Sequence, residues 1–457
     1  MIIDLSEKLD SRILAEMCGG KINSAVEINS ISIDSREVGK NTLFVAVKGE
    51  VTDGHKYIGS AVKNGAVCVM CEYVPEGVEC NYILVGDTIK AISDIAAYCR
   101  NKINPFTVGV TGSVGKTTTK EFISYVLGEK YNTHKSGGNF NTVYGLSLTL
   151  AALSASHKAV VAEMGMSAFG EISQLTAIAQ PDAAVITNIG TAHMEALGSR
   201  ENICKAKLEI IEGLKENGTL IYNGDEPLLW EKREAFPQCI SIGIKNSKVN
   251  VFGSNIRCER FSTVFDMQFK GEIIKDISIP TVGEHNVYNA MAAYACGVLA
   301  GMSEDEIRRG LGKYVPSGMR QRIYDKKGFT VIEDCYNASP ESMKAALSVL
   351  SSVGKGKRKI AVLGDMRELG DNSVMLHRGV GAVAAEQGID MVCSYGGLAS
   401  DIAESASENG VGSIYCHTDC NDPAGMAEYL KGILKEGDVV LFKASRAVSL
   451  EKVIELL

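Results

Sequence analysis

The sequence lacks long apolar segments and lacks a cluster of basic residues. No run of 18 apolar residues occurs, so we expect no membrane span. The first ten residues, MIIDLSEKLD, contain neither a basic n-region nor an apolar h-region, so we expect no secretory signal. The formal net charge is −8 and no basic block accompanies it, which argues against a nucleic-acid-binding surface.

A disulfide framework is also absent from the pattern. The 13 cysteines are odd in number and scattered, which indicates reduced thiols in a cytoplasmic protein. Cys68 and Cys71 form a C-x-x-C, but they lie in a strand-like run, where residues three apart point to opposite faces. Since no further ligands follow at zinc spacing, buried thiols are favoured over a metal site here. The same holds for Cys416, His417 and Cys420.

The composition is that of a packed globular protein, with 45% hydrophobic and 22% charged residues. A length of 457 residues corresponds to about three domains. Breaks at Pro105 and Pro316 place these domains at residues 1–104, 105–316 and 317–457. Strand-like runs alternate with helical patterns, so we expect an α/β fold with mostly parallel sheets and right-handed crossovers.

A phosphate-binding loop is the strongest motif. Residues 106–110 read as a buried strand, TGSVGKTTT follows, and residues 121–130 have helical spacing. Such a strand, glycine turn and helix start direct backbone N–H groups at an anion. The general pattern has a further glycine where Val110 stands, so a chance glycine turn is the alternative. The motif predicts ATP or GTP binding through Thr111, Gly112, Ser113, Val114, Gly115, Lys116, Thr117 and Thr118.

Polar residues follow several other predicted strands of residues 105–316. Glu163 ends one apolar run and His193 follows another, and parallel strands place ligands at their carboxyl ends. With Thr117, these two side chains predict a Mg²⁺ site beside the nucleotide. The loop before residue 143, with Asn139, Asn141 and Thr142, suits ligand contact, or it is a plain connector.

Two helical patterns in this region carry polar residues of uncertain role. Residues 201–214 contain Lys205 and Lys207, for which an exposed helix face is the plain alternative. Residues 282–302 begin with His285, Asn286 and Asn289 within about one turn. These three side chains could cap the helix or contact the edge of a base.

Residues 317–457 repeat the alternation of strand and helix, which indicates a doubly wound, Rossmann-like domain. Strand-like runs are FTVIED, RKIAVLGD, DMVCSYG and DVVLFKAS. No G-x-G-x-x-G occurs, so a dinucleotide is not implied. The strand ends carry Asp334, Asp365 and Lys443, where such a sheet places its ligand. The first region offers less: two short strands flank a polar turn at Ser35 and Arg36, which is an anion site or a solvated turn.

Together these stretches resemble the Mur ligase family over the whole chain. The loop G-x-x-G-K-T-T-T, without a glycine at Val110, is the form found in that family. The stretch DSREV…LFVAVKG…DGH is similar to the uridine-nucleotide domain that the D-alanyl-D-alanine-adding members share with the preceding ligase of the pathway. DCYNASPESM and VLGDMRELG are similar to the D-alanyl-D-alanine-adding members in particular, and FKASRAVSLEKV is similar to their C-terminal signature. The D-N-P-R-like stretch of the amino-acid-adding relatives is not present.

The resemblance implies a role for each predicted site residue. Lys116 and Thr117 would bind the phosphates of ATP and Mg²⁺, Glu163 and His193 would hold metal, and Lys207 matches a lysine that can be carbamylated. Asn286 and Asn289 match residues on the adenine side, Arg320 one that reaches the phosphates, and Asp334 one on the ribose or metal side. The implied catalytic set is Lys116, His193, Lys207 and Arg320. The implied substrate contacts are Ser35, Arg36, Asn139, Asn141, Thr142, Tyr336, Asn337, Lys443 and Ser445.

The reaction implied is ATP-dependent addition of D-alanyl-D-alanine to UDP-N-acetylmuramoyl-tripeptide through an acyl phosphate, in cytoplasmic peptidoglycan precursor synthesis. The three domains would bind the uridine nucleotide, ATP and the incoming dipeptide, in that order along the chain, and a monomer is expected. A related amide ligase resembling folylpolyglutamate synthase is one alternative. A nucleotide-switched binding protein is another, although the guanine-specific N-K-x-D is absent.

Overall fold

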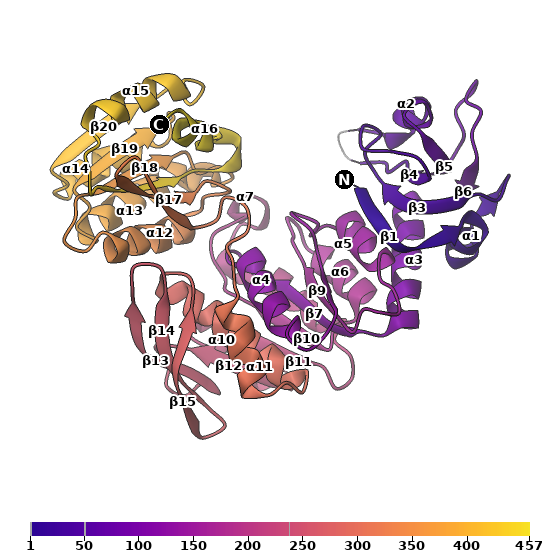
Figure 1. Cartoon of the computed structure of the whole chain (residues 1–457), viewed down its shortest axis with the longest axis horizontal. Coiled ribbons are helices and arrows are strands. Elements are labelled where there is room, and N and C mark those ends of the chain that lie inside the picture. The colour runs from indigo at the N-terminus through magenta and orange to yellow at the C-terminus, as the bar shows by residue number, and fades with distance from the viewer. Residues whose placement is uncertain (1, 50–51, 237) are drawn as a thin grey trace. The chain divides into compact units, whose positions relative to one another are not determined.

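The computed structural model describes residues 2–49, 52–236 and 238–457, and it is a mixed α/β protein with three sheets (Figure 1). The chain forms two compact units. One comprises residues 1–111, 130–185 and 206–220, and the other comprises residues 112–129, 186–205 and 221–457. The three domains predicted from sequence, with boundaries near residues 104 and 316, stay a prediction.

The first unit begins with a six-stranded sheet in the order β1-β3-β4-β5-β6-β2. Its strands β3 to β6 are parallel, and β1 and β2 pair antiparallel with β3 and β6. The C-x-x-C lies in β5, where Cys68 and Cys71 belong to two different cores on opposite faces, as predicted. Burial raises the pKa of both thiols to about 12. The elements are β1 (Ile2–Asp10), α1 (Ser11–Cys18), β2 (Lys21–Ile22), β3 (Glu27–Ser32), β4 (Thr42–Val45), α2 (Ile58–Lys63), β5 (Ala66–Cys71), β6 (Tyr82–Leu84) and α3 (Thr88–Ile103).

The same unit holds four further strands in the order β10-β7-β9-β8, with β9 parallel to both β7 and β8. All residues of β9 and β10 are buried, because parallel strands are covered on both faces and so read as continuous apolar runs. This explains why the sequence located them. The elements are β7 (Phe106–Thr111), β8 (Thr133–Lys135), α5 (Val143–Ala151), β9 (Ala159–Glu163), α6 (Glu171–Ala179) and β10 (Ala183–Ile186).

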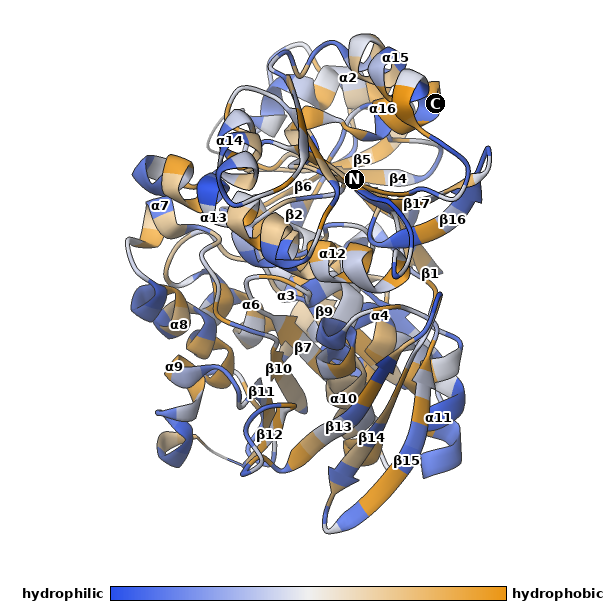
Figure 2. Ribbon diagram, turned by 90° about the vertical axis from the view of Figure 1, so that its left-hand side faces the viewer, coloured by the Kyte–Doolittle hydropathy of each residue, from blue (hydrophilic) through white to orange (hydrophobic). Residues whose placement is uncertain are grey.

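In the second unit, strands β11 to β15 follow one another across the sheet. β12 pairs parallel with β13, whereas the pairs β13–β14 and β14–β15 are antiparallel, so it is this edge that departs from the parallel pairing expected of the sheet. Lys270 and Gly271, between β14 and β15, both have positive φ, as in the two-residue turns that join neighbouring antiparallel strands. Apolar and polar residues are mixed along β15, as the colours of Figure 2 show, because only part of the strand is buried.

The remaining elements of this part of the chain include the helix that follows the phosphate loop and the helix that carries the asparagine pair. They are α4 (Lys116–Leu127), α7 (Met194–Leu197), α8 (Arg200–Leu208), β11 (Thr219–Asn223), α9 (Pro227–Trp230), β12 (Cys239–Gly243), β13 (Val251–Cys258), β14 (Thr263–Phe269), β15 (Glu272–Ile279), α10 (Glu284–Leu299) and α11 (Glu304–Gly312).

The last sheet of the second unit has the order β16-β17-β21-β18-β19-β20, and all of its strands except β16 are parallel. Helices α12 and α13 lie on one face and α15 and α16 on the other (Figure 1). Alternate residues of β18 enter the two cores: Ala361 and Leu363 face one, Ile360 and Val362 the other. The doubly wound arrangement predicted from sequence is therefore confirmed.

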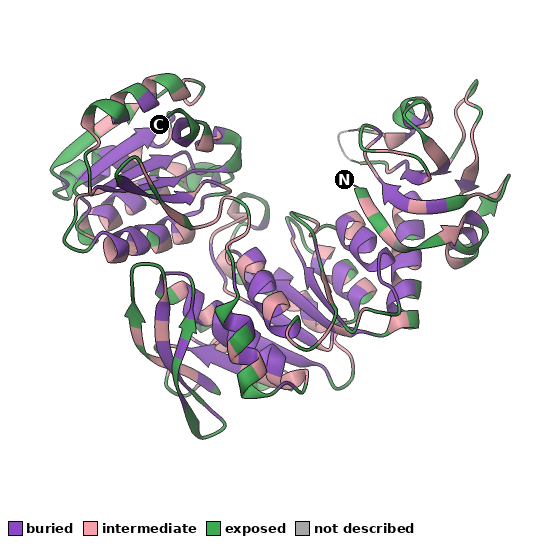
Figure 3. Ribbon diagram, viewed as in Figure 1, coloured by how far each residue is buried: buried purple, intermediate pink, exposed green. Residues whose placement is uncertain are grey.

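Two strands of this sheet, β16 (Arg322–Lys326) and β20 (Ser413–His417), were not predicted from the sequence. They lie at its two edges and neither contains a buried residue, so neither is an apolar run; Figure 3 shows the exposure of β20. The other elements are β17 (Phe329–Asp334), α12 (Pro340–Val353), β18 (Lys359–Gly364), α13 (Ser373–Glu386), β19 (Met391–Tyr395), α14 (Ser400–Glu408), α15 (Pro423–Ile433), β21 (Val439–Lys443) and α16 (Glu451–Leu456). Within the described ranges, no helix has both the length and the apolar character needed to cross a bilayer.

A histidine pair in the first unit predicts a pH-dependent stability. The rings of His134 and His157 are 5.1 Å apart, and burial, together with the second ring, lowers the pKa of His134 to about 4. An unfolded histidine titrates near 6.5, so between these values the unfolded chain binds more protons and stability falls as the pH falls. Between pH 6.5 and 4.5, we expect the free energy of unfolding to drop by about 2 kcal/mol more than in His134→Gln. Urea denaturation at both pH values measures this difference, and equal losses would contradict it.

Candidate active site

The phosphate loop connects β7 to α4. Gly112 and Gly115 have φ values of 148° and 82°, which side chains rarely tolerate. A Cβ atom on Gly112 would lie 1.8 Å from Oγ1 of Thr187, so only glycine fits there. Val110 is a fully buried residue inside β7 and pairs with Glu163 of β9. The glycine of the general pattern is therefore not needed at this position, because the strand has not yet ended.

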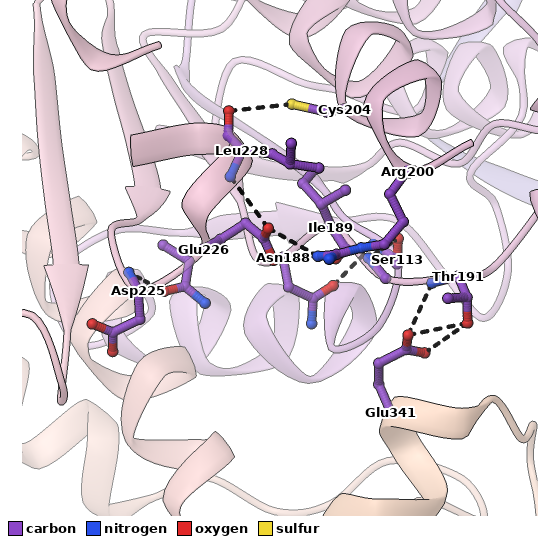
Figure 4. Close-up of polar contacts among 12 residues, drawn as sticks. Ser113, Asn188, Ile189, Thr191, Arg200, Cys204, Asp225, Glu226, Leu228 and Glu341 are labelled. Atoms are coloured by element: carbon purple, nitrogen blue, oxygen red, sulfur yellow. Dashed lines mark hydrogen bonds and ion pairs between the residues drawn. The ribbon is translucent and has the colours of Figure 1, made fainter. Parts of the chain in front are cut away.

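The loop after β10 holds the phosphate loop in place (Figure 4). The side-chain oxygen of Asn188 accepts the backbone N–H groups of Ser113 and Val114 at 3.1 and 3.0 Å. Thr187 Oγ1 donates to the carbonyl of Val114 at 2.6 Å, and the N–H of Gly190 donates to Ser113 Oγ at 2.8 Å. Sequence reasoning missed Thr187 and Asn188, although the rule that polar residues follow strand ends applies to both.

The first turn of α4 has the geometry of an anion site. Its N-cap residue is Gly115, which has no side chain to accept the N–H groups of the first turn. Those groups and the helix dipole attract negative charge. At the start of the loop, Thr111 Oγ1 is buried without a hydrogen-bond partner among the described residues. The Lys116 ammonium lies 2.7 Å from the Gly112 carbonyl. These features fit a phosphate group.

Glu163, the last residue of β9, is buried beside the asparagine loop. The side-chain N–H of Asn141 donates to Glu163 Oε1 at 3.3 Å, and the backbone carbonyl of Asn141 accepts the N–H of Gly165 at 2.8 Å. Thr142 caps α5 by accepting the N–H of Gly145, whereas Asn139 is exposed. The structure thus places a predicted substrate contact, Asn141, within hydrogen-bonding distance of a predicted metal ligand, Glu163.

The two lysines of α8 have different environments. Lys205 is exposed, as the plain alternative predicted, but Lys207 is only 1% exposed. An exposed helix face is therefore wrong for Lys207. The burial of this ammonium is costly unless anionic or polar groups compensate it, which is consistent with a functional position.

The asparagine pair of α10 is part of a buried polar chain. Thr119 Oγ1 donates to Asn289 at 2.8 Å, and the Asn289 side-chain N–H donates to Asn286 at 3.1 Å. Asn286 in turn donates to Gln321, which also contacts His285 at 2.9 Å. Burial lowers the pKa of His285. The chain fixes α10 against the helix of the phosphate loop, and Gln321 was not predicted from the sequence.

Predicted residues of the last sheet lie at its carboxyl edge. Asp334 and Lys443 pair in register, and the Lys443 ammonium, only 2% exposed, lies 2.6 Å from Asp334 and 2.9 Å from the Asn337 carbonyl. The Arg320 guanidinium stacks on the Tyr336 ring at 3.6 Å from its centroid. Asp334 and Lys443 end β17 and β21, Tyr336 and Asn337 follow β17, and Arg320 precedes β16.

The neighbouring strand end of β18 carries a second buried carboxylate. Asp365 accepts the N–H of Ala399 at 2.8 Å and pairs with Arg367 at 3.1 Å. The Ser445 hydroxyl accepts the N–H of Arg367 at 3.0 Å. Ser445, a predicted substrate contact, therefore shapes the loop that follows β18.

The remaining predicted residues stand as follows. Ser35 is buried, while Arg36 is exposed and forms a bidentate pair with Asp34. This pair holds the pKa of Asp34 well below its usual range. His193 Nδ1 lies 3.7 Å from Glu368, and Thr117 is buried in α4. No cluster of three or more His, Cys, Asp or Glu suited to a metal was found in the described portion of the chain. The predicted metal set stays a prediction.

Three family models match the chain in succession. They are the "Mur ligase family, catalytic domain" at residues 27–105, the "Mur ligase middle domain" at 110–297 and the "Mur ligase, glutamate ligase domain" at 319–446. A UDP-N-acetylmuramoyl-tripeptide–D-alanyl-D-alanine ligase from Bacillus subtilis is 42% identical over 449 residues, which covers 97% of this chain and 96% of that relative.

This chain belongs to the Mur ligase family. The structure is similar to MurF from Acinetobacter baumannii, with a TM-score of 0.89, 30% identity and 99% coverage of both chains. It is also similar to a MurF ligase from Thermotoga maritima in complex with ADP, with a TM-score of 0.82, 31% identity and coverage of 93% and 96%. The predicted family, the α/β fold class and the class of ATP-dependent, amide-bond-forming ligase are confirmed.

Membership of the Mur ligase family explains the form of the phosphate loop. The residues assigned by resemblance, from Lys116 and Thr117 to Lys207 and Arg320, stay predictions residue by residue. What the structure adds is their surroundings: a loop shaped for a phosphate and a buried lysine–aspartate pair at the edge of a second sheet.

Proposed function

We propose that this Mur ligase joins D-alanyl-D-alanine to UDP-N-acetylmuramoyl-tripeptide, with ATP and Mg²⁺, as a cytoplasmic monomer in peptidoglycan precursor synthesis. The observation that carries the proposal is the full-length likeness to relatives that share this one activity by name. The likeness includes the last sheet, whose strand ends carry the stretches DCYNASPESM and VLGDMRELG. Neither nucleic acid nor membrane forms part of this function.

Each region has a proposed ligand. Residues 1–104 would bind the uridine nucleotide through Ser35 and Arg36, with Asn139, Asn141 and Thr142 nearer the peptide. Residues 105–316 would bind ATP, and residues 317–457 the dipeptide, with Tyr336, Asn337, Lys443 and Ser445 as contacts. The division of the chain into three regions, one for each of the three ligands, supports this assignment.

The proposed chemistry has two steps. An oxygen of the tripeptide carboxylate attacks the γ-phosphorus of ATP, the β–γ bridge bond breaks, and ADP leaves with that electron pair. The dipeptide amine then attacks the acyl carbon, the C–N bond forms, and the C–O bond to phosphate breaks as the amine loses its proton. Two anions must approach each other in the first step, so positive charge is needed where they meet.

The chain supplies that charge through Lys116 and Arg320. The Lys116 ammonium is held at the loop, and the stacking of Arg320 on Tyr336 limits the orientations of its guanidinium. Asn286 and Asn289 are proposed to define the adenine side, and Asp334 the ribose or metal side.

Mg²⁺ would be held by Thr117, Glu163 and His193. The Thr117 hydroxyl and the buried Glu163 carboxylate, held by Asn141, are oxygen donors that suit Mg²⁺, whereas the His193 imidazole is an unusual ligand for this ion. The ion would neutralise charge on the phosphates. If Lys207 is carbamylated, it adds an anionic group that would help to position the ion. Its side chain is only 1% exposed, which supports a role beyond that of a solvated surface lysine.

The substrate set itself is the first test. With ATP, UDP-MurNAc-tripeptide and D-Ala-D-Ala, we expect the pentapeptide product and one inorganic phosphate for each amide bond, because phosphate leaves in the second step. A coupled phosphate assay and mass spectrometry of the nucleotide product measure both. Omission of the dipeptide is the control and should stop sustained phosphate release. Release with a folate and glutamate in place of these substrates would instead assign the chain to the folylpolyglutamate synthase branch.

A further inference from the structure

The segment of residues 190–195, which follows β10, is held from one side by the phosphate loop; we name it the coupling segment. The N–H of Gly190 donates to Ser113 Oγ at 2.8 Å. Just before it, the carbonyl of Ile189 accepts a hydrogen bond from Arg200 at 2.7 Å, and Arg200 is itself paired with Glu226 (Figure 4). The segment therefore cannot shift without disturbing Ser113, a member of the loop.

The other side of the coupling segment is bound by a carboxylate of α12, the first helix that packs on the last sheet. Glu341, the second residue of α12, accepts the backbone N–H of Thr191 at 3.0 Å. The Thr191 hydroxyl donates to the same carboxylate, at 3.0 and 3.3 Å from its two oxygens. A Cβ on Gly190 would lie 2.9 Å from Cδ of Glu341, so a side chain at this position would displace the Glu341 carboxylate.

A second element of the same sheet reaches the coupling segment. Glu368, in the loop after β18, lies 3.7 Å from His193. Gly370 of that loop packs near Glu195, since a Cβ built on it would be 3.7 Å from the Glu195 Cβ. The two stretches that touch the segment are the ones that resemble the D-alanyl-D-alanine-adding members, DCYNASPESM and VLGDMRELG.

From this geometry we propose that Glu341 is a positioning residue, which sets the acceptor-binding edge of the last sheet relative to the phosphate loop. α12 begins at Pro340, three residues after Asn337, whose carbonyl binds Lys443 beside Asp334. The chain Ser113, Gly190, Thr191 and Glu341 thus connects the place where phosphate is transferred with the place where the amine is proposed to bind. The inference rests on the proposed function.

The chemistry of the pair favours a carboxylate. The backbone N–H and the hydroxyl of Thr191 both donate to Glu341, and an ionised carboxylate is acceptor-only. A glutamine would keep one acceptor oxygen for the N–H and would present its own N–H to the Thr191 hydroxyl, which can also accept, so this substitution removes the charge and leaves both groups partnered. Hydrogen bonds to charged groups contribute more than neutral ones.

The test separates the two chemical steps in the full-length enzyme. A quench-flow burst of ADP with ATP and UDP-MurNAc-tripeptide alone reports the first step, and steady-state turnover with varied D-Ala-D-Ala reports the second. For Glu341→Ala, which leaves both Thr191 groups without this acceptor, we expect kcat/KM for the dipeptide to fall about 10- to 100-fold, and for Glu341→Gln we expect a smaller fall, of no more than about 10-fold. The burst should change by no more than about 2-fold and Tm should change little, because Glu341 does not touch the phosphate loop.

Two further variants serve as conservative variant and control. Thr191→Ser keeps both the backbone N–H and the hydroxyl that face Glu341, and it should retain kcat/KM to within about 3-fold of the native enzyme. Glu404→Gln, on α14 with a side chain 63% exposed, should behave as native.

The results distinguish the two proposals. Equal loss of the burst and of acceptor turnover, or native kcat/KM in both Glu341 variants, would overturn the role of Glu341. A loss of kcat/KM in Thr191→Ser as large as that in Glu341→Ala would also overturn it, because the serine keeps both donors. No turnover by the native enzyme with this substrate set would overturn the proposed function, and the inference with it.

Discussion

Lys116→Ala is expected to reduce phosphate release with the full substrate set by about 10²- to 10³-fold or more. The Lys116 ammonium is the side-chain cation of the loop and lies 2.7 Å from the Gly112 carbonyl, within a turn shaped for a phosphate. Its loss leaves the transferring phosphoryl group without that charge in the first step. A coupled assay for inorganic phosphate, at saturating concentrations of all three substrates, measures the change.

The same variant should keep its affinity for the uridine nucleotide nearly unchanged. Ser35 and Arg36 lie in the turn between β3 and β4, and the hydrogen bonds of Arg36 go to Asp34, far from the phosphate loop in sequence. Calorimetric titration with UDP-MurNAc-tripeptide should give a Kd within about 2-fold of the native value. Lys90→Ala, which removes an exposed lysine from α3, is the matched control. If Lys116→Ala lost both turnover and nucleotide affinity, independent binding by residues 1–104 would be ruled out.

Lys207→Met is expected to lower kcat by about 10²-fold with little change in Tm. Methionine keeps the length and volume of the buried stem and removes the nitrogen, so packing is retained. If the nitrogen carries a carbamate, the native enzyme equilibrated with ¹³C-bicarbonate should show a carbamate carbon by NMR. The variant should lack that signal.

Lys205→Met provides the control, because Lys205 lies two residues earlier in α8 and is exposed. It should retain native turnover and the native carbon signal. A large fall in Tm for Lys207→Met with nearly native turnover of the remaining folded enzyme would show that Lys207 is structural. A native turnover together with an absent carbon signal in both proteins would remove Lys207 from the proposed site.

The sequence located features that depend on neighbours along the chain. The phosphate loop was found because its glycines, lysine and threonines are consecutive between a buried strand and a helix. Strands β9, β10, β17 and β18 were found because strands covered on both faces must be apolar throughout. The edge strand β20 was missed because one-sided exposure removes that pattern. Strands β13 and β15 were missed because their burial is interrupted.

Other features were decided only when distant parts of the chain packed together. Lys205 and Lys207 are two residues apart and chemically identical, yet one is exposed and the other buried. Asn188 and Thr187 anchor a loop more than 70 residues away, and Gln321 joins the asparagine pair of α10. No local periodicity encodes these contacts, because each depends on which distant side chains are brought together by packing.

By itself, the sequence determined the family, the α/β class and the identity of the phosphate loop, because these rest on consecutive residues and on strand and helix periodicity. Only the tertiary structure decided which lysine is buried, what holds the loop, and that Glu341 meets Thr191 across 150 positions. The physical reason is that burial and hydrogen bonding between distant residues are properties of packing, and a linear pattern specifies the elements that pack without specifying the contacts between them.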